Sequence, residues 1–469
     1  LYIYLTVPAV AFFGLTEFAT RLPSALAGIL AVYGLYLFAN QLFPDLKLKI
    51  RNYKLTIGEI TATILAITPW HLYFSRMAWE ANVYLTFLLF TLYFLLKALQ
   101  AKSFPLYPSV ILATLTLLIY QGAKLLTPLS ILITLFLFHQ SALIRIINFR
   151  KNSLDSAVIA FCTAFAIALF FTNLNGPAGN RLNRLSLFNY NPPLTQTKDL
   201  LHHHYDLHLR MIASRYLNHF SPEFLFYDGI FADREHLPNQ GLFLISTSFL
   251  LLVGLYQLTK KLTPNSILIL FITFIAPLPA SMTLGDFSAV RSLFLIVPLS
   301  LIAGLGLFWL LSRKLGWLFL LILLFNSAYS IDLYFKHSNE LWFKELNAFY
   351  KPAIQAIKNN PADRVILTDV YGQPYIYYLF YTAYDPQTYQ QNRRFIDGGV
   401  DVGRIASVAN VEFHQFNTTE LATTPNTIFI GTIGNLPNSY NYSGDHIAYY
   451  QDIVTPDKKE LMLRVVKTK

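Results

Sequence analysis

Ten apolar runs, each close to the length that an α-helix needs to cross a bilayer, dominate this 469-residue sequence. Hydrophobic residues make up 54% of the chain and charged residues 13%, too few charges to cover a soluble surface of this size. The sequence therefore predicts a polytopic α-helical membrane protein with about ten transmembrane helices. We place them at residues 24–43, 57–74, 81–98, 105–120, 124–139, 155–173, 241–258, 265–281, 291–311 and 316–334.

The basic residues of the short connections alternate between the two sides of the predicted membrane. One set of loops holds Lys47, Lys49, Arg51, Lys54, Lys97, Lys102, Arg145, Arg150, Lys151, Lys260, Lys261, Arg313 and Lys314. The opposite set holds only Arg21, Arg76, Lys124 and Arg291. Positive residues concentrate on the cytoplasmic side, so we assign the first set to the cytoplasm. Because the net charge of +10 comes from residues between spans, we expect no nucleic-acid partner.

Two longer segments then lie outside. Residues 174–240 are too long for a plain connection and are predicted to form an external loop with short helices on the membrane surface. From about residue 336 the composition becomes more polar, and residues 364–369, 427–432 and 461–466 are typical of buried strands. Residues 340–358 and 373–382 are predicted helices. We expect a membrane domain over 1–335 and a small extracytoplasmic α/β domain over 336–469.

The first residues form a shorter apolar stretch, 1–15, which could be a truncated span or a helix lying in the membrane interface. The sequence opens with Leu1 and shows no signal peptide. We therefore expect that this chain is a fragment lacking its natural N-terminus.

The chain contains no nucleotide-binding, serine-hydrolase or zinc-protease motif. Its informative residues are ions at the outer ends of spans, where ionisable groups are costly. Arg76 and Glu80 lie one helical turn apart between two spans, and Glu80 could act as a general base. Alternatively, Glu80 is a carboxylate favoured by the dipole of the next helix and paired with Arg76.

Lys124 and Arg291 are cations at two further outer span ends. Together with Arg76 they could bind a phosphate or pyrophosphate, Arg through its planar fork and Lys as a point charge. The alternative is that each reaches toward lipid headgroups.

The run from His202 to His208 invites a metal interpretation, since His204 and His208 would share a helix face. A catalytic zinc needs a third ligand, and no further residue has metal-ligand spacing. An interfacial polar helix is favoured. We predict no metal site, although a divalent ion remains compatible with the chemistry.

Five segments resemble those of the GT-C class of membrane glycosyltransferases, in particular the family 39-like group that includes protein mannosyltransferases and the aminoarabinose transferase of lipid A. They occur in the family's order and are Glu17–Ala25, Pro69–Asn82, Tyr120–Pro128, Asn218–Phe226 and Ala276–Ala280 leading to Arg291. His71, His219 and Asp228, which lie in or beside these segments, are candidate acceptor or cleft residues.

The resemblance implies transfer of a hexose or pentose, with inversion, from a polyprenyl-phosphate donor to a lipid, glycan or protein acceptor on the outer face of the membrane. It implies that Glu80 matches the second of two catalytic acids and that the first lies upstream of Leu1, so the fragment would be inactive. It also implies donor-phosphate binding by Arg291 and Lys124, and by Arg76. The expected location is the plasma membrane.

A transporter or flippase of lipid-linked sugars is the alternative function. It would use a similar basic outer groove but would also need a polar path to the inside. Few charged residues interrupt the centres of the predicted spans, which argues against such a path.

Overall fold

The computed structural model describes residues 2–50, 52–101, 104–141, 153–174, 186–187, 204–227, 235, 240–313, 316–396 and 403–469. The chain forms two compact units, Leu1–Asp332 and Leu333–Lys469.

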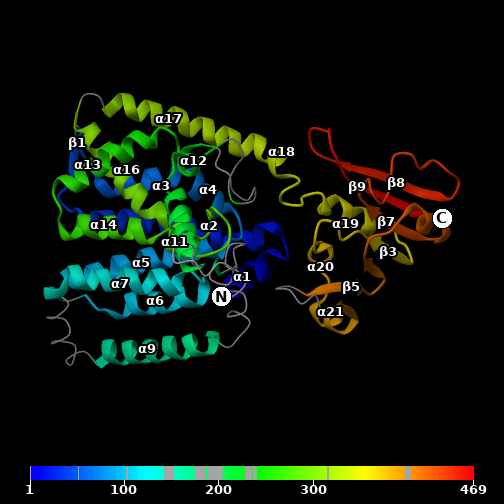
Figure 1. Cartoon of the computed structure of the whole chain (residues 1–469), viewed down its shortest axis with the longest axis horizontal. Helices are drawn as coiled ribbons and strands as arrows, with labels where there is room; N and C mark the ends of the chain where they lie inside the picture. The colour runs from blue at the N-terminus through cyan, green and yellow to red at the C-terminus, as the bar shows by residue number, and fades with distance from the viewer. Residues whose placement is uncertain are drawn as a thin grey trace. The chain divides into compact units, whose positions relative to one another are not determined.

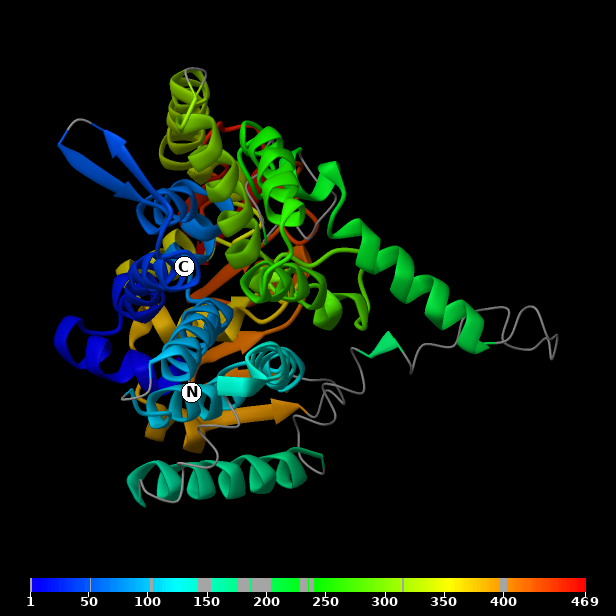
Figure 2. The same ribbon diagram turned by 90° about the vertical axis from the view of Figure 1, so that its left-hand side faces the viewer.

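The first unit is a helical bundle with one small β-hairpin (Figure 1). Figure 2 shows this hairpin extending away from the helices. The elements are α1 (Tyr2–Phe13), α2 (Glu17–Leu42), β1 (Lys47–Ile50), β2 (Tyr53–Thr56), α3 (Ile57–Ile67), α4 (Pro69–Arg76), α5 (Glu80–Gln100), α6 (Tyr107–Ile119), α7 (Ala123–Leu137), α9 (Ser153–Leu174), α11 (His204–Asn218), α12 (Pro222–Phe226), α13 (Thr247–Lys260), α14 (Pro264–Ile275), α15 (Leu278–Ser281), η2 (Leu293–Leu295), α16 (Ile296–Leu311) and α17 (Gly316–Asp332).

Every predicted span is mainly helical, and the prediction of a polytopic helical membrane protein is confirmed. Among the described residues, five helices are long and apolar enough to cross a membrane by themselves, and five shorter apolar helices accompany them. The predicted span 57–74 is divided into α3 and α4 at Thr68, whose ψ of 126° is extended. Pro69 explains the break, because the residue before a proline avoids the helical conformation. The short connection turns one apolar run into two helices.

The helices pack in neighbouring pairs, among them α2 with α5, α5 with α6, and α13 with α16. Figures 1 and 2 both place α6 and α7 between α5 and α9. The closest approach is between α13 and α16, where a Cβ on Gly254 would overlap the carbonyl oxygen of Ile302, and one on Gly306 that of Leu250. Small residues at such crossings let two membrane helices pack backbone to backbone.

The second unit is built on a seven-stranded mixed sheet of order β4-β5-β6-β3-β7-β9-β8, in which β3 runs parallel to β6 and β7. Its elements are η3 (Leu333–His337), α18 (Ser338–Trp342), α19 (Tyr350–Asn359), β3 (Arg364–Leu367), α20 (Pro374–Thr382), α21 (Pro386–Asn392), β4 (Arg393–Ile396), β5 (Arg404–Val408), β6 (Val411–Phe413), α22 (Thr418–Thr423), β7 (Thr427–Gly431), β8 (Ile447–Val454) and β9 (Leu461–Thr468).

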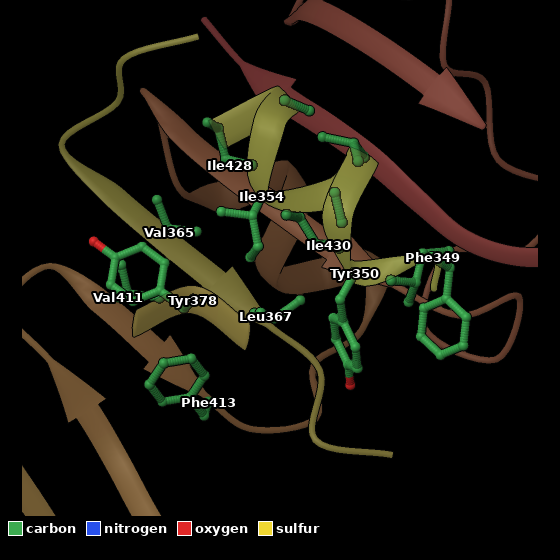
Figure 3. Packing of buried hydrophobic residues seen from close by; sticks show 14 of the residues in the cluster. Phe349, Tyr350, Ile354, Val365, Leu367, Tyr378, Val411, Phe413, Ile428 and Ile430 are labelled. Carbon is green, nitrogen blue, oxygen red and sulfur yellow. The ribbon is translucent and has the colours of Figure 1, made fainter. Parts of the chain in front are cut away.

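The core of this unit lies between the sheet and helices α19 and α20. Figure 3 shows Tyr350 and Ile354 of α19 over the apolar side chains of β3 and β7, with Tyr378 and Phe413 beside them. The three predicted strands are present as β3, β7 and β9. The predicted helix 340–358 is interrupted between α18 and α19, where Asn347 has a φ of 54°. Asparagine tolerates this left-handed conformation better than most residues, so the chain turns there.

Candidate functional site

The loop formed by residues 282–292, between α15 and η2, is the point where several candidate segments meet. Trp70 of α4 donates its indole N–H to the carbonyl oxygen of Ala289 at 3.2 Å. The hydroxyl of Tyr120, in the turn between α6 and α7, donates to the carbonyl oxygen of Val290 at 3.4 Å. The 282–292 loop also carries Arg291, so two of the segments that support the family resemblance contact the segment of this cation directly.

Arg291 is half-buried and lies along its own loop. Its Nη1 donates to Thr283 Oγ1 at 2.8 Å and to the carbonyl oxygen of Leu284 at 3.1 Å. Among the described residues, no acceptor bonds its Nε or Nη2. A guanidinium offers five N–H donors in a planar fork, and an anion such as phosphate can be bound by the donors that remain. The geometry therefore fixes the direction of the side chain and leaves one edge for a ligand.

Glu235 is a further contact of the same loop. Its Oε2 accepts hydrogen bonds from the Ser288 hydroxyl at 3.2 Å and from the Val290 N–H at 3.1 Å. Burial raises the pKa of this carboxyl above its usual value, although the hydrogen bonds and the nearby Arg291 act in the other direction. Glu235 thus ties down the residues on either side of Ala289.

His219, a predicted cleft residue, is a second anchor of the loop. It is completely buried at the end of α11, and its ring packs on Phe224 with 4.9 Å between centroids. Its Nδ1 lies 2.7 Å from the carbonyl oxygen of Arg215, and its Nε2 accepts the Ser288 N–H at 3.3 Å. These partners require the neutral ring with the proton on Nδ1. Burial lowers the pKa of His219 and so favours the same form.

Sequence reasoning missed two residues of this arrangement, Arg215 and Glu235. Arg215 is almost fully buried, donates to the carbonyl oxygen of Thr283 at 3.2 Å and lies 3.5 Å from the carboxylate of Asp286. Both residues belong to the long segment 174–240, where no motif surrounds them. The signal in the sequence was the presence of ionisable residues in a long segment that also carries aromatic clusters.

Lys124 stands beside an apolar groove. Its Nζ donates a hydrogen bond to Gln121 Oε1 at 2.6 Å. Lys124 lies four residues after Tyr120, the residue at which the turn between α6 and α7 begins. The groove has a volume of about 570 Å³ and is bounded by α5, α6, α7 and α9. Its walls include Leu95, Leu117, Pro128, Ile131, Leu135 and Cys162. Lys124 is therefore a charged residue on the wall of a cavity whose lining is mainly apolar and suits a hydrocarbon chain.

Glu80 and Arg76 lie at the same end of the helical unit. Glu80 is exposed as the first residue of α5, and Arg76 is exposed as the last residue of α4. One turn further along α5, the ring of Tyr84 stacks on Tyr120 at 5.5 Å and approaches Phe294 at 6.3 Å. The first turn of α5 therefore adjoins both the α6–α7 turn and the segment that follows the 282–292 loop.

Of the other predicted residues, the structure describes the side chains of His71 and His208. His71 is buried on α4, and its Nε2 lies 3.4 Å from the Oγ of Ser75 on the same helix. Asp228 lies outside the described residues. His202 and His203 do too, whereas His208 is buried on α11. Within the described ranges, no three His, Cys, Asp or Glu side chains are grouped as a metal site would require.

Comparisons with known proteins bear on the fold. No family profile matches the chain, and no curated protein sequence does either. ArnT from Cupriavidus metallidurans is similar in its apo state, with a TM-score of 0.50, and in its undecaprenyl phosphate complex, with a TM-score of 0.52. Each match has 12% identity and covers 99% of this chain and 86% of ArnT. The apo oligosaccharyltransferase of Archaeoglobus fulgidus matches at a TM-score of 0.45 and 12% identity, over 92% of this chain and 61% of that one. The chain therefore has an ArnT-like fold, a polytopic helical membrane unit followed by a mixed β-sheet domain.

Proposed function

We propose that this protein transfers a sugar from a polyprenyl-phosphate donor to an acceptor, at the end of the helical unit that carries the 282–292 loop. The observation that carries the proposal is the position of Lys124. It heads an apolar groove of about 570 Å³, and the same turn contacts the loop of Arg291 through Tyr120. A long hydrocarbon chain ending in a phosphate has the complementary chemistry. ArnT, which shares the fold, binds undecaprenyl phosphate.

The reaction follows from the charges. An acceptor hydroxyl attacks the anomeric carbon, and the bond from that carbon to the phosphate oxygen breaks, leaving its electron pair on the polyprenyl phosphate. Arg291 and Lys124 stabilise the charge that develops there, since fixed cations are effective where water is excluded. Glu80 accepts the proton of the acceptor hydroxyl. Phosphate is itself the leaving group, so no nucleotide is needed.

The distribution of basic residues among the loops is the basis on which we orient the protein in the membrane. Lys47, Lys49, Lys54, Lys97 and Lys260 belong to the opposite ends of the helices, which we assign to the cytoplasm. The Arg291 loop is then on the outer side. Because α17 follows α16 after a short turn, the chain returns to the outer side before Leu333, and we place the second unit there.

The test is transfer of label from undecaprenyl-phosphate-linked hexoses and pentoses by the full-length protein in vesicles. Arg291→Ala should lower transfer about 100-fold, as loss of a fixed cation at a developing anion does. Lys54→Ala, an exposed cation on β2, is the matched control and should remain within about twofold. Movement of the intact donor across the membrane without bond cleavage would support the transporter instead.

Glu80→Gln separates the two interpretations of this carboxylate. If Glu80 accepts the proton of the acceptor hydroxyl, Glu80→Gln should lower turnover strongly and change thermal stability little. A wild-type rate with slightly reduced stability would show that Glu80 only favours the first turn of α5.

A further inference from the structure

A pocket of about 670 Å³, lined by both apolar and polar side chains, lies at the other end of the helical unit, formed by the ends of α2, α5, α13 and α16 and the start of α14. Glu80 and Gln100 are the two ends of α5, so this pocket lies about 30 Å from the candidate site at 1.5 Å per residue. It takes no part in the proposed transfer reaction.

Carboxamide side chains dominate the polar part of the lining. They are Gln41, Gln100, Gln257 and Asn265. Gln41 Nε2 donates to Gln100 Oε1 at 2.6 Å, and Asn265 Nδ2 donates to the carbonyl oxygen of Leu42 at 2.6 Å. Within the part of the chain that the structure describes, the Gln257 amide has no hydrogen-bond partner. Amides donate and accept, so a set of them suits a ligand with several hydroxyl groups.

Charge at this end favours an anion. Lys261 lines the pocket, is exposed, and forms no ion pair with any described residue. Arg313 lies over the ring of Trp309, another lining residue, at 4.8 Å. The described acids nearby are Asp45, Glu59 and Asp155. Glu59 bonds Thr56 and Tyr53, and Asp155 caps α6 through Leu106 and Tyr107. Asp45, on the pocket wall, is the acid that could face a ligand hydroxyl.

The surrounding surface is apolar, as a lipid-bound ligand requires. Leu258 and Leu305 form part of the wall, and Leu255, Tyr256 and Leu262 are exposed on either side of the polar residues of α13. Hydrocarbon chains can lie along this exposed, apolar side of α13 while a polar headgroup enters the pocket. Basic pockets between helices at the membrane surface bind anionic headgroups in the same way.

We infer that this pocket binds the headgroup of an anionic glycerophospholipid that carries free hydroxyls, with Lys261 at the phosphodiester and the Gln257 amide at the hydroxyl groups. The lipid would hold the ends of α2, α5, α13 and α16 together, at the face that we assign to the cytoplasm.

Native mass spectrometry of the full-length chain with equal amounts of phosphatidylglycerol and phosphatidylcholine tests this inference. We expect one phosphatidylglycerol to be retained, about tenfold in preference to phosphatidylcholine. Lys261→Ala should weaken retention about fivefold, and Gln257→Leu, which keeps the side-chain size, about tenfold. Lys261→Arg should restore binding, which would exclude a folding defect as the cause.

Lys260→Ala is the matched control, because it removes the same charge from the neighbouring residue, which does not line the pocket. It should change retention by less than about twofold. An equal loss in Lys260→Ala and Lys261→Ala would overturn the inference, since general attraction to a basic surface would explain both. Equal retention of the two lipids would overturn it too. Displacement of the lipid by millimolar glycerol phosphate would show that the pocket binds a soluble phosphate.

Discussion

Replacing Glu235 by Ala tests whether this residue holds the 282–292 loop in place. The change removes the acceptor of the Val290 N–H at 3.1 Å and of the Ser288 hydroxyl at 3.2 Å. The hydroxyl can turn to another acceptor, but a buried N–H left without a partner costs about 1–3 kcal/mol. We expect Glu235→Ala to lower the free energy of unfolding by about 2–3 kcal/mol and Glu235→Gln by about 1 kcal/mol, because one amide oxygen can still accept.

The assay combines thermal unfolding in detergent with binding of undecaprenyl phosphate. If the Glu235 contacts set the position of Arg291, Glu235→Ala should weaken lipid-phosphate binding about tenfold, whereas Glu235→Gln should retain most of it. Glu223→Ala, an exposed carboxylate on α12, serves as the control and should change stability by less than about 0.5 kcal/mol. Unchanged stability and unchanged binding in Glu235→Ala would refute the assignment of Glu235 as the residue that positions this loop.

The pH dependence of the same variants gives an independent check. Burial raises the pKa of Glu235 in the folded chain above its ordinary value of 4.5. The carboxyl therefore contributes most to stability below pH 4.5, and this contribution is lost as the pH rises through the folded-state pKa. The stability difference between wild type and Glu235→Gln should shift in favour of the variant over that window. A difference that does not vary with pH would contradict the role of burial.

Three further predictions concern residues that the structure places under clear constraints. Burial lowers the pKa of His219, so its contribution to the stability of the fold is complete above about pH 6.5 and is lost as the pH falls through the lower folded-state pKa. His219→Phe should remove this pH dependence of thermal unfolding, and a variant with the same pH dependence as the wild type would contradict the prediction. Arg464→Leu should destabilise the second unit by about 3–5 kcal/mol, because Arg464 is buried and its Nε and Nη2 bond both oxygens of Asp452. A thermal unfolding curve, followed by circular dichroism, that does not differ from that of the wild type would contradict this. Gly254→Ala should disrupt the α13–α16 packing and reduce the yield of folded protein, whereas Leu252→Ala on the exposed face of α13 should not.

The helical part of the fold was predictable because its cause is local. A run of about twenty apolar residues must form a helix in lipid, where each backbone N–H and C=O needs a partner within its own segment. The exceptions are positions such as Thr68, where the effect of the following proline divides one run into two helices. The pattern fixed the number of apolar segments, but it did not show where a segment bends.

The β-sheet unit was predictable only in its buried strands. β3 and β7 contain short continuous apolar runs, because their side chains enter hydrophobic clusters on both faces of the sheet, and β9 is apolar on both sides of Arg464. β4 has all four residues exposed, and along β8 exposure alternates, so neither shows such a run. The short β6 lies between β5 and β3, and its place depends on pairings with distant strands. Edge strands and short strands are defined by their partners, which a single sequence does not reveal.

The candidate site shows a different limit. The sequence indicated cations and carboxylates at span ends, but the contacts that join their segments to the 282–292 loop run through backbone groups. Trp70 and Tyr120 donate to carbonyl oxygens of Ala289 and Val290, whereas Glu235 accepts the Val290 N–H. None of these backbone groups differs from any other in the sequence. A search for reactive side chains therefore finds Arg291 and overlooks the backbone contacts that hold its loop.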